Sequence, residues 1–214
     1  MVNSTTQNGY ETKKNNSTNK RFKTVTIAKI AILGAVASLL MLFDIPLFFA
    51  PSFYKLDLSE VPVLLGAFSM GPVAGIVIEA VKILLNFVID GSITAGVGEL
   101  ANFLIGCSFV VPAAIIYKRK KTRKNAIIGL VVGTVIMVIF SALINIYVLL
   151  PVYASAFKMP VDAIVEMGTR INSAITDLNT LIMFATVPFN TVKGFCSSLI
   201  TVLIYKKLSP LLHR

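Results

Sequence analysis

Long apolar stretches fill the chain after residue 20, and short polar or proline-containing segments separate them. A helix of roughly 20 apolar residues is long enough to cross a lipid bilayer. The pattern predicts six helices, over residues 23–43, 60–69, 72–89, 96–117, 125–150 and 178–206. The second is too short to cross perpendicular to the membrane, so we expect it to tilt or to span part of the depth.

The connections between these helices carry signals of their own. We expect Pro151 to end the fifth helix, because proline removes a backbone donor, and Pro188 to kink the sixth. Residues 152–178 are more polar and predict an outer connector with partial helix. In residues 44–58, lysine and aspartate alternate with leucine, which favours an extended segment. This aromatic loop is either an interfacial belt or a lid over a site.

Composition places these helices in a membrane. Hydrophobic residues make up 56% of the chain, charged residues 14%, and the mean hydropathy is +0.81. A soluble protein is less apolar and nearer a quarter charged. The sequence therefore predicts an all-α integral membrane protein, with residues 1–20 as a disordered polar cytoplasmic tail and residues 21–214 as one six-helix membrane domain.

The net charge of +10 is concentrated in short runs beside the apolar helices. The strongest run, residues 118–124, predicts a cytoplasmic loop that faces lipid phosphates rather than a nucleic acid. Six helices then place both termini in the cytoplasm, and the acidic loops fall outside. We expect a multi-pass protein of a prokaryotic cytoplasmic membrane.

The chemistry centres on Asn190 and Lys193, which share one face of the last apolar helix. A cation inside a membrane helix is costly, and this cost makes it a candidate functional residue. The predicted topology places this pair in the outer half of the membrane. Other polar or aromatic residues fall at the same depth and complete a candidate pocket: Asn145, Glu99, Asn102, Phe53 and Tyr54.

Three residue pairs allow two interpretations each. Glu99 and Asn102 either cap their own helix or face a ligand. Glu79 and Lys82 are three residues apart on one helix, which favours a structural ion pair over a ligand contact. Ala31 and Ala35 form a small-residue face that either packs inside the protein or docks a membrane partner.

Asparagine and lysine donors beside flat aromatic surface suit a planar heteroaromatic ligand with an acceptor–donor–acceptor edge. The sequence has no arginine clamp for a highly phosphorylated ligand. It also lacks a nucleophile motif and a metal cluster, which argues against an enzyme. Residues 71–75 are not a phosphate loop, because the Gly-Lys-Ser/Thr ending is missing.

Several motifs in order resemble the riboflavin-specific substrate-binding (S) components of energy-coupling factor (ECF) transporters. They lie at KLDLSEVPVLLGAFSMGPVAGIVIEAVKILLN (55–86), at 97–134, at LINIYVLLPVYASAFKMP (143–160), and at AITDLN and VPFNTVKG near the end. The resemblance implies a six-helix, vitamin-binding membrane subunit with no catalytic cofactor. It implies uptake powered by two ATP-binding subunits through a transmembrane coupling subunit, with the S component toppling in the bilayer.

The resemblance also implies roles for residues. Asn145, Asn190 and Lys193 match the family's flavin ligands. First-loop contacts fall near Phe53, Tyr54, Lys55 and Leu56, and Ala31 and Ala35 match its docking face. Two alternatives stay open: an S component for a related flavin such as FMN, and a standalone secondary carrier with Glu79 as its proton site.

Overall fold

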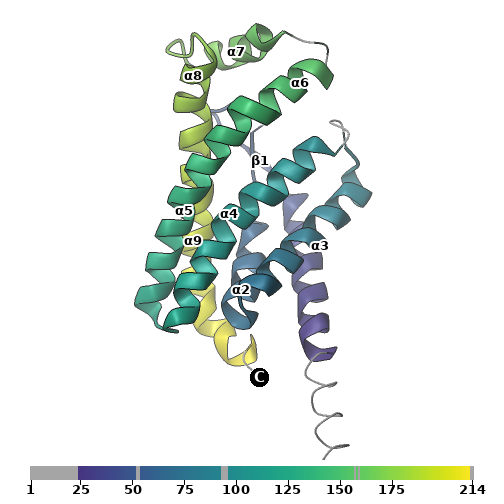
Figure 1. Ribbon diagram of the computed structural model, residues 1–214, viewed down its shortest axis with the longest axis vertical. Helices are drawn as coiled ribbons and strands as arrows, with labels where there is room; N and C mark the ends of the chain where they lie inside the picture. The colour runs from purple at the N-terminus through teal and green to yellow at the C-terminus, as the bar shows by residue number, and fades with distance from the viewer. Residues whose placement is uncertain (1–23, 52–53, 93–95, 157, 159, 213–214) are drawn as a thin grey trace, which may run out of the picture.

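A computed structural model describes residues 24–51, 54–92, 96–156, 158 and 160–212, with side chains up to residue 205. Within that part the chain is largely helical; some helices run along the long axis, others are tilted from it, and a short helix lies across one end (Figure 1). Five helices are long and apolar enough to cross a membrane, and Glu60–Met70 is a shorter apolar helix. The predicted polar tail lies outside the described residues.

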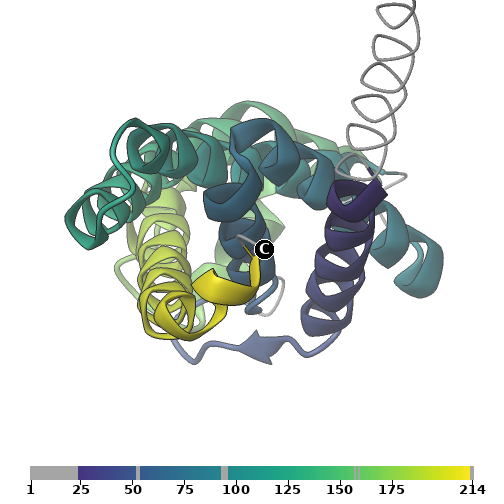
Figure 2. The same cartoon turned by 90° about the horizontal axis from the view of Figure 1, so that it is seen from below.

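The chain begins with helix α1 (Thr24–Met41) and a short hairpin. Strand β1 (Ile45–Pro46) pairs antiparallel with β2 (Lys55–Leu56), which confirms the expected extended character of this loop. Seen along the long axis, the hairpin passes between α1 and α9 (Figure 2). The first loop therefore lies across one face of the bundle.

The middle of the chain forms four helices. They are α2 (Glu60–Met70), α3 (Pro72–Asp90), α4 (Val97–Arg119) and α5 (Arg123–Ile144). Gly71 separates α2 from α3 with a positive φ of 101°, a conformation that glycine adopts without steric cost. Helix α4 packs against both α3 and α5.

Pro151 does not end the fifth helix, so that expectation is wrong. The helix continues through a π-helical segment, η1 (Asn145–Leu149), into α6 (Leu150–Ala156). Pro151 is the second residue of α6 and lies inside one continuous helix, Arg123–Ala156. The π-helical segment directly before it can compensate for the backbone donor that proline lacks. The expected connector with partial helix is confirmed by α6 and by α7 (Val161–Thr169).

The last membrane helix is also irregular, and the kink expected at Pro188 stays a prediction. It consists of α8 (Leu178–Leu181), a second π-helical segment η2 (Ile182–Thr186), and α9 (Val187–Leu212). Pro188 is the second residue of α9. Both π segments lie toward the same end of the bundle, near α6 and α8 (Figure 1). Such segments occur often at functional sites.

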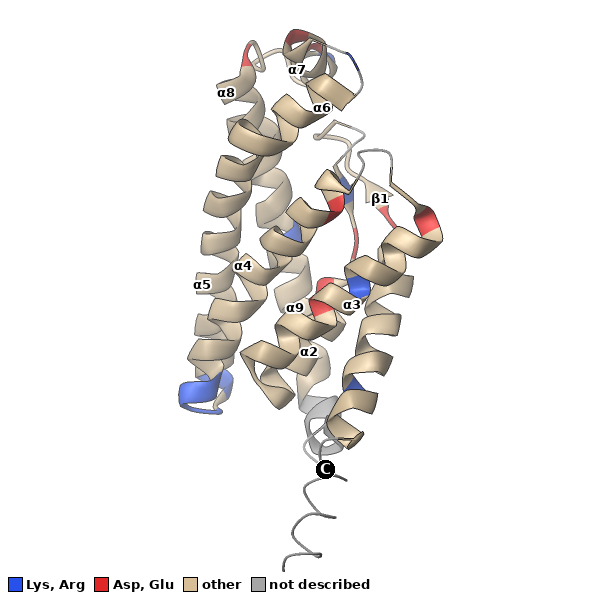
Figure 3. Cartoon of the chain, turned by 45° about the vertical axis from the view of Figure 1, so that its right-hand side comes forward, with Lys and Arg blue, Asp and Glu red and all other residues tan. Residues whose placement is uncertain are grey.

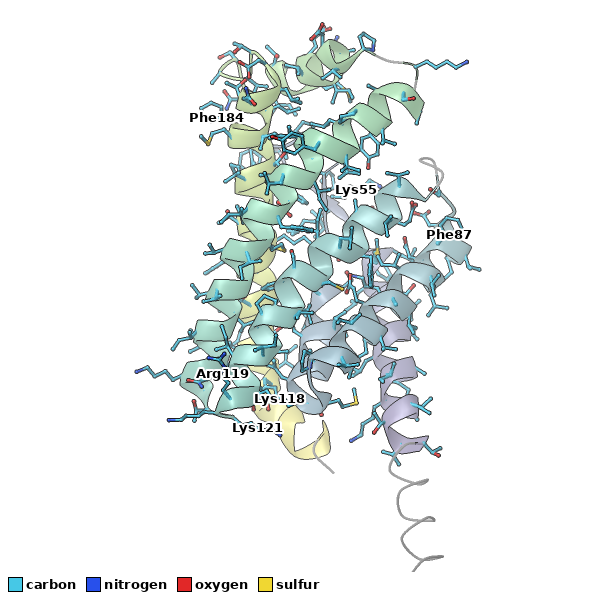
Figure 4. All side chains as sticks on the ribbon, in the orientation of Figure 1. Lys55, Phe87, Lys118, Arg119, Lys121 and Phe184 are labelled. Atoms are coloured by element: carbon cyan, nitrogen blue, oxygen red, sulfur yellow. The ribbon has the colours of Figure 1, made fainter. Side chains whose placement is uncertain are left out.

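Two apolar clusters hold the bundle together. One joins α2, α4 and α5 through buried residues such as Leu64, Phe109 and Leu130. The other lies under α7 and includes Leu150, Ile175 and Leu181, with Tyr54 of the first loop packed against it. Many large apolar side chains instead point outward, as expected for lipid contact; Phe87 and Phe184 do so in Figure 4.

Charge is segregated along the long axis (Figure 3). The loop between α4 and α5 is strongly basic, and Lys118, Arg119 and Lys121 lie at this end (Figure 4). Acidic residues gather in the other half, on α7, directly before α8, at the end of α3 and on the first loop (Figure 3). The described chain starts and ends on the basic side (Figure 1), which is the arrangement that the positive-inside rule requires of a cytoplasmic face.

Candidate functional site

Lys193 on α9 is buried inside the bundle and forms an ion pair with the first loop. Its Nζ lies 2.9 Å from Oδ2 of Asp57, directly after β2. The exposed fractions of the two side chains are 9% and 6%. A buried cation of this kind requires a partner, and Asp57 provides it from a segment 136 residues away in sequence.

Asp57 is held in place by its own neighbours. Its Oδ1 accepts a hydrogen bond of 2.8 Å from the backbone N–H of Ser59 and another from the Ser59 hydroxyl. Burial alone would raise the pKa of Asp57, but the charges of Lys193 and Lys82 and these hydrogen bonds lower it to about 2. The carboxylate is therefore ionised at neutral pH and ties the loop to α9.

Tyr54 links the same loop to both π segments. Its hydroxyl donates a 2.9 Å hydrogen bond to Oδ1 of Asn145 and lies 2.6 Å from the hydroxyl of Thr186, which is the last residue of η2. Because Tyr54 has one proton to donate, Thr186 donates in the second bond. Burial raises the pKa of Tyr54, which keeps this hydroxyl protonated. Its ring also packs on Phe189, with 5.1 Å between centroids.

The two asparagines differ in their position relative to the π segments: Asn145 is the first residue of η1, and Asn190 lies four residues after the end of η2. Asn145 donates its side-chain amide to the carbonyl of Ser141 at 2.8 Å, and Asn190 donates to that of Thr186 at 3.0 Å. Each bond reaches back four residues and leaves the carboxamide oxygen for other contacts. The oxygen of Asn145 accepts from Tyr54, whereas that of Asn190 has no hydrogen-bond partner among the described residues.

The structure places four predicted residues in two bonded sets: Tyr54, Asn145 and Asn190 are joined through Thr186, and Lys193 is joined to Asp57. Asn190 and Lys193 are three residues apart on α9 and share a face, so we treat the two sets as one polar cluster. Sequence reasoning missed two members. A buried lysine needs a counter-ion, and this rule could have pointed to Asp57. Thr186 lies four residues before Asn190 and so on the same helix face, which was the available signal for it.

Other predicted residues lie away from this cluster. Lys55 forms an ion pair of 2.8 Å with Asp44, and its side chain is 56% exposed. Strand alternation explains this, because Lys55 points opposite to Tyr54 and Leu56, which are partly buried. Lys55 lies in the half of the bundle opposite the basic end (Figure 4). Phe53 lies outside the described residues.

Glu99 and Asn102 lie at the start of α4. Glu99 accepts a 2.9 Å hydrogen bond from the hydroxyl of Ser92, and this hydroxyl accepts from the backbone N–H of Gly96. These bonds favour local pairing of Glu99 with Ser92 over a ligand contact, and the N-cap of α4, Gly96, has no side-chain cap. Asn102 is partly buried, and no hydrogen bond joins it to the cluster within the described part of the chain.

The small residues of α1 divide between two faces. Gly34, Ala37 and Ser38 are buried, and a Cβ added to Gly34 would lie 2.5 Å from Val81 on α3. Ala31 and Ala35 are exposed on the other face. Packing inside the protein, one of the two interpretations of the Ala31 and Ala35 pair, is therefore excluded, and their face is open to a partner or lipid.

The second buried lysine, Lys82, is enclosed by carboxylates. The predicted pair with Glu79 is confirmed at 2.6 Å, and Glu60 adds an unexpected partner at 2.8 Å. All three side chains are at most 1% exposed. Lys82 therefore pairs with Glu79 and with Glu60, and no hydrogen bond or ion pair among the described residues joins these three to Asn145 or Asn190.

Comparisons with known proteins place this arrangement in a family. Residues 25–205 match the model for the ECF transporter, substrate-specific component. A relative from Staphylococcus aureus, named riboflavin transporter RibU, is 38% identical over 94% of this chain and 97% of its own length. Another from Bacillus subtilis, named riboflavin transporter FmnP, is 31% identical over 88% of this chain and 94% of its own.

A solved structure described as the S component of a bacterial ECF transporter has the same fold. It superposes with a TM-score of 0.69 at 35% identity, covering 90% of this chain and 99% of the other. The length of the matches, the sequence identities and the shared fold all indicate the same family. The chain belongs to the family of substrate-specific components of ECF transporters.

Proposed function

We propose that this protein is the riboflavin-binding membrane subunit of an ECF-type uptake system. The observation that carries the proposal is the buried cluster around Lys193 and Asn190, which presents unused donors and an unused acceptor inside an apolar bundle. Relatives that align over nearly the whole chain are named riboflavin transporters, which supports the same ligand.

The chemistry of the cluster matches a flavin ring. One edge of the isoalloxazine ring offers a carbonyl, an N–H and a second carbonyl. The carboxamide oxygen of Asn190 can accept from the N–H, and Lys193 has two ammonium protons beyond the one used by Asp57. The aromatic pair Tyr54 and Phe189 provides flat apolar surface for the ring.

Charge favours riboflavin over FMN. A phosphate needs a cation with charge to spare, yet Lys193 is paired with Asp57 and Lys55 with Asp44. Binding of FMN would place a dianion near these two carboxylates. The uncharged vitamin requires only hydrogen bonds, which the cluster offers without breaking either ion pair.

Uptake also requires partner chains. The full sequence has no phosphate-binding loop, so we assign ATP hydrolysis to two ATP-binding subunits and its coupling to a transmembrane subunit. The exposed Ala31 and Ala35 face on α1 is our candidate docking surface, since small side chains allow close helix approach. The basic end of the bundle then faces the cytoplasm, in a prokaryotic cell membrane.

The ligand assignment is tested with purified protein. We expect it to carry a yellow flavin absorbance, and added riboflavin to bind with quenched fluorescence and more tightly than FMN. Asn190→Ala should weaken riboflavin binding by about 1–3 kcal/mol, because a buried polar group loses its partner. Asn179→Ala, at an exposed position on α8, is the control. A colourless protein that fails to bind riboflavin at micromolar concentration would contradict the proposal.

The docking surface is tested by co-purification with the three partner subunits. Ala31→Leu and Ala35→Leu should leave riboflavin affinity unchanged and abolish recovery of the complex. Val135→Phe adds similar bulk to an exposed position on α5 and should assemble normally. Complex recovery that is the same in all three variants would place the docking surface elsewhere.

A further inference from the structure

A network of buried ionisable side chains lies beside the binding cluster. Lys82 on α3 contacts Glu60 on α2 at 2.8 Å and Glu79 on α3 at 2.6 Å. Asp57 and Lys193 lie close enough to interact electrostatically with them: Asp57 with Lys82, and Lys193 with Glu79. From α4, the thiol of Cys107 also faces Glu79, Glu60 and Lys82.

The charges of this network do not balance. Three carboxyl groups, Asp57, Glu60 and Glu79, face two ammonium groups, Lys82 and Lys193. With every group ionised, the network would carry one uncompensated negative charge inside the membrane domain. The cost of an unpaired buried charge is large, and proteins commonly avoid it by changing the protonation state of the group.

The hydrogen bonds indicate that Glu79 is the group whose negative charge would be uncompensated. Lys82 donates a well-formed hydrogen bond to Oε1 of Glu60. Oε2 of Glu60 and both oxygens of Glu79 are buried without a hydrogen-bond partner among the described residues, although Oε1 of Glu79 lies beside the Lys82 ammonium. An ionised carboxylate with so few hydrogen-bond donors around it is poorly stabilised. A neutral carboxylic acid needs fewer hydrogen-bond donors.

The crowded surroundings of Glu79 suit a bound proton better than a metal cation. A Cβ added to Gly106 on α4 would lie 2.3 Å from Oε1 of Glu79 and 3.2 Å from Oε1 of Glu60. The α4 backbone therefore presses directly against both carboxyl groups. Lys82 occupies the space between them, and a cation such as sodium would need several more oxygen ligands than these two groups have free.

We propose that the protein holds one resident proton on Glu79, so that the network of Asp57, Glu60, Glu79, Lys82 and Lys193 is neutral at physiological pH. The proton site is separate from the flavin site, and it does not depend on the ligand assignment. It allows α2, α3 and α4 to meet in the membrane without a net buried charge.

The test is infrared spectroscopy of the purified protein at neutral pH, in a maltoside detergent that has no ester carbonyl. We expect a carboxylic-acid C=O band that shifts slightly in D₂O. Glu79→Gln should lose the band. Glu60→Gln should also lose it, because removing that charge leaves two carboxylates for two ammonium groups, and Glu79 then ionises.

Glu166→Gln is the matched control, since Glu166 is 63% exposed on α7, and it should keep the band. Thermal melting of each variant serves as the check of folding. Absence of the band from the wild type, or its survival in Glu79→Gln, would overturn the proposal. If the band is absent and the melting temperature instead rises with sodium at constant ionic strength, a metal cation occupies the site and the proton assignment is wrong.

Discussion

Among the described residues two lysines are buried inside the bundle, and their surroundings differ. Lys82 is bound by Glu79 on its own helix, α3, and by Glu60 on the neighbouring α2, and all three side chains are essentially inaccessible. Lys193 is bound by Asp57 alone, and Asp57 belongs to the first loop. One cation is locked within the helical bundle; the other connects the bundle to its most irregular segment.

This difference separates a structural cation from a functional one. A buried cation is costly in either place, so burial alone does not distinguish the two roles. The distinguishing feature is the unused hydrogen-bonding capacity nearby. Around Lys193 it includes spare ammonium protons and the free oxygen of Asn190, whereas around Lys82 the unsatisfied atoms are carboxylate oxygens, which attract a proton.

The largest expected effect is on the folded state and comes from Lys82→Met. Removing one partner of a buried ion network leaves carboxylates without compensation, which costs about 3–5 kcal/mol of stability. We expect a much lower thermal midpoint in detergent, or little folded protein. Lys118→Met, at an exposed position near the end of α4, should melt like the wild type. Equal melting of the two variants would show that the network is not needed for folding.

The second effect is on ligand binding and comes from Lys193→Met. This change should weaken riboflavin binding by about 1–3 kcal/mol, because the flavin carbonyl loses its donor. It should lower the thermal midpoint less than Lys82→Met does, since Asp57 keeps its hydrogen bonds from Ser59. Titration of riboflavin fluorescence measures the affinity. Unchanged affinity would assign Lys193 the same structural role as Lys82.

The two lysines also differ in whether their partners could be predicted from the sequence. Length and hydropathy were sufficient to predict the membrane helices, because the lipid bilayer imposes a strong requirement on both properties. The pair of Glu79 and Lys82 followed from helical spacing alone. The partnership of Lys193 with Asp57 could not follow from spacing, because it joins residues 136 positions apart and depends on how the loop folds back.

The π segments show a second limit of prediction from the sequence. Pro151 and Pro188 indicate irregular helices, but they do not specify a kink, an end or a wider turn. The structure places η1 and η2 before these prolines, and each carries a cluster residue, Asn145 or Thr186. Only this wider geometry, invisible to a helical-periodicity analysis, brings both to the hydroxyl of Tyr54.

A smaller effect is expected from Tyr54→Phe, which removes one hydroxyl and keeps the ring on Phe189. The hydroxyl bridges Asn145 and Thr186, so its loss leaves both without this contact and costs about 1 kcal/mol of riboflavin affinity. Tyr147→Phe is the control, because Tyr147 is 73% exposed and should bind riboflavin like the wild type. An affinity loss as large as that of Lys193→Met would mean that the loop contact, and not the buried cation, dominates binding.

The smallest effect is the pH dependence of the pair between Asp57 and Lys193. The folded-state pKa of Asp57 is about 2, below its usual 3.8, so the pair's contribution is complete above the usual value and is lost as the pH falls toward 2. Proton linkage gives a loss of about 0.3 kcal/mol by pH 4 and about 1 kcal/mol by pH 3.

Thermal melting of the wild type and Asp57→Asn isolates the contribution of Asp57, because other acidic groups titrate in both. The stability difference between them should be constant from pH 7 to 5 and shrink below pH 4. A difference that instead shrinks between pH 7 and 5 would mean that Asp57 is not ionised beside Lys193, and that this lysine is free for an anionic ligand.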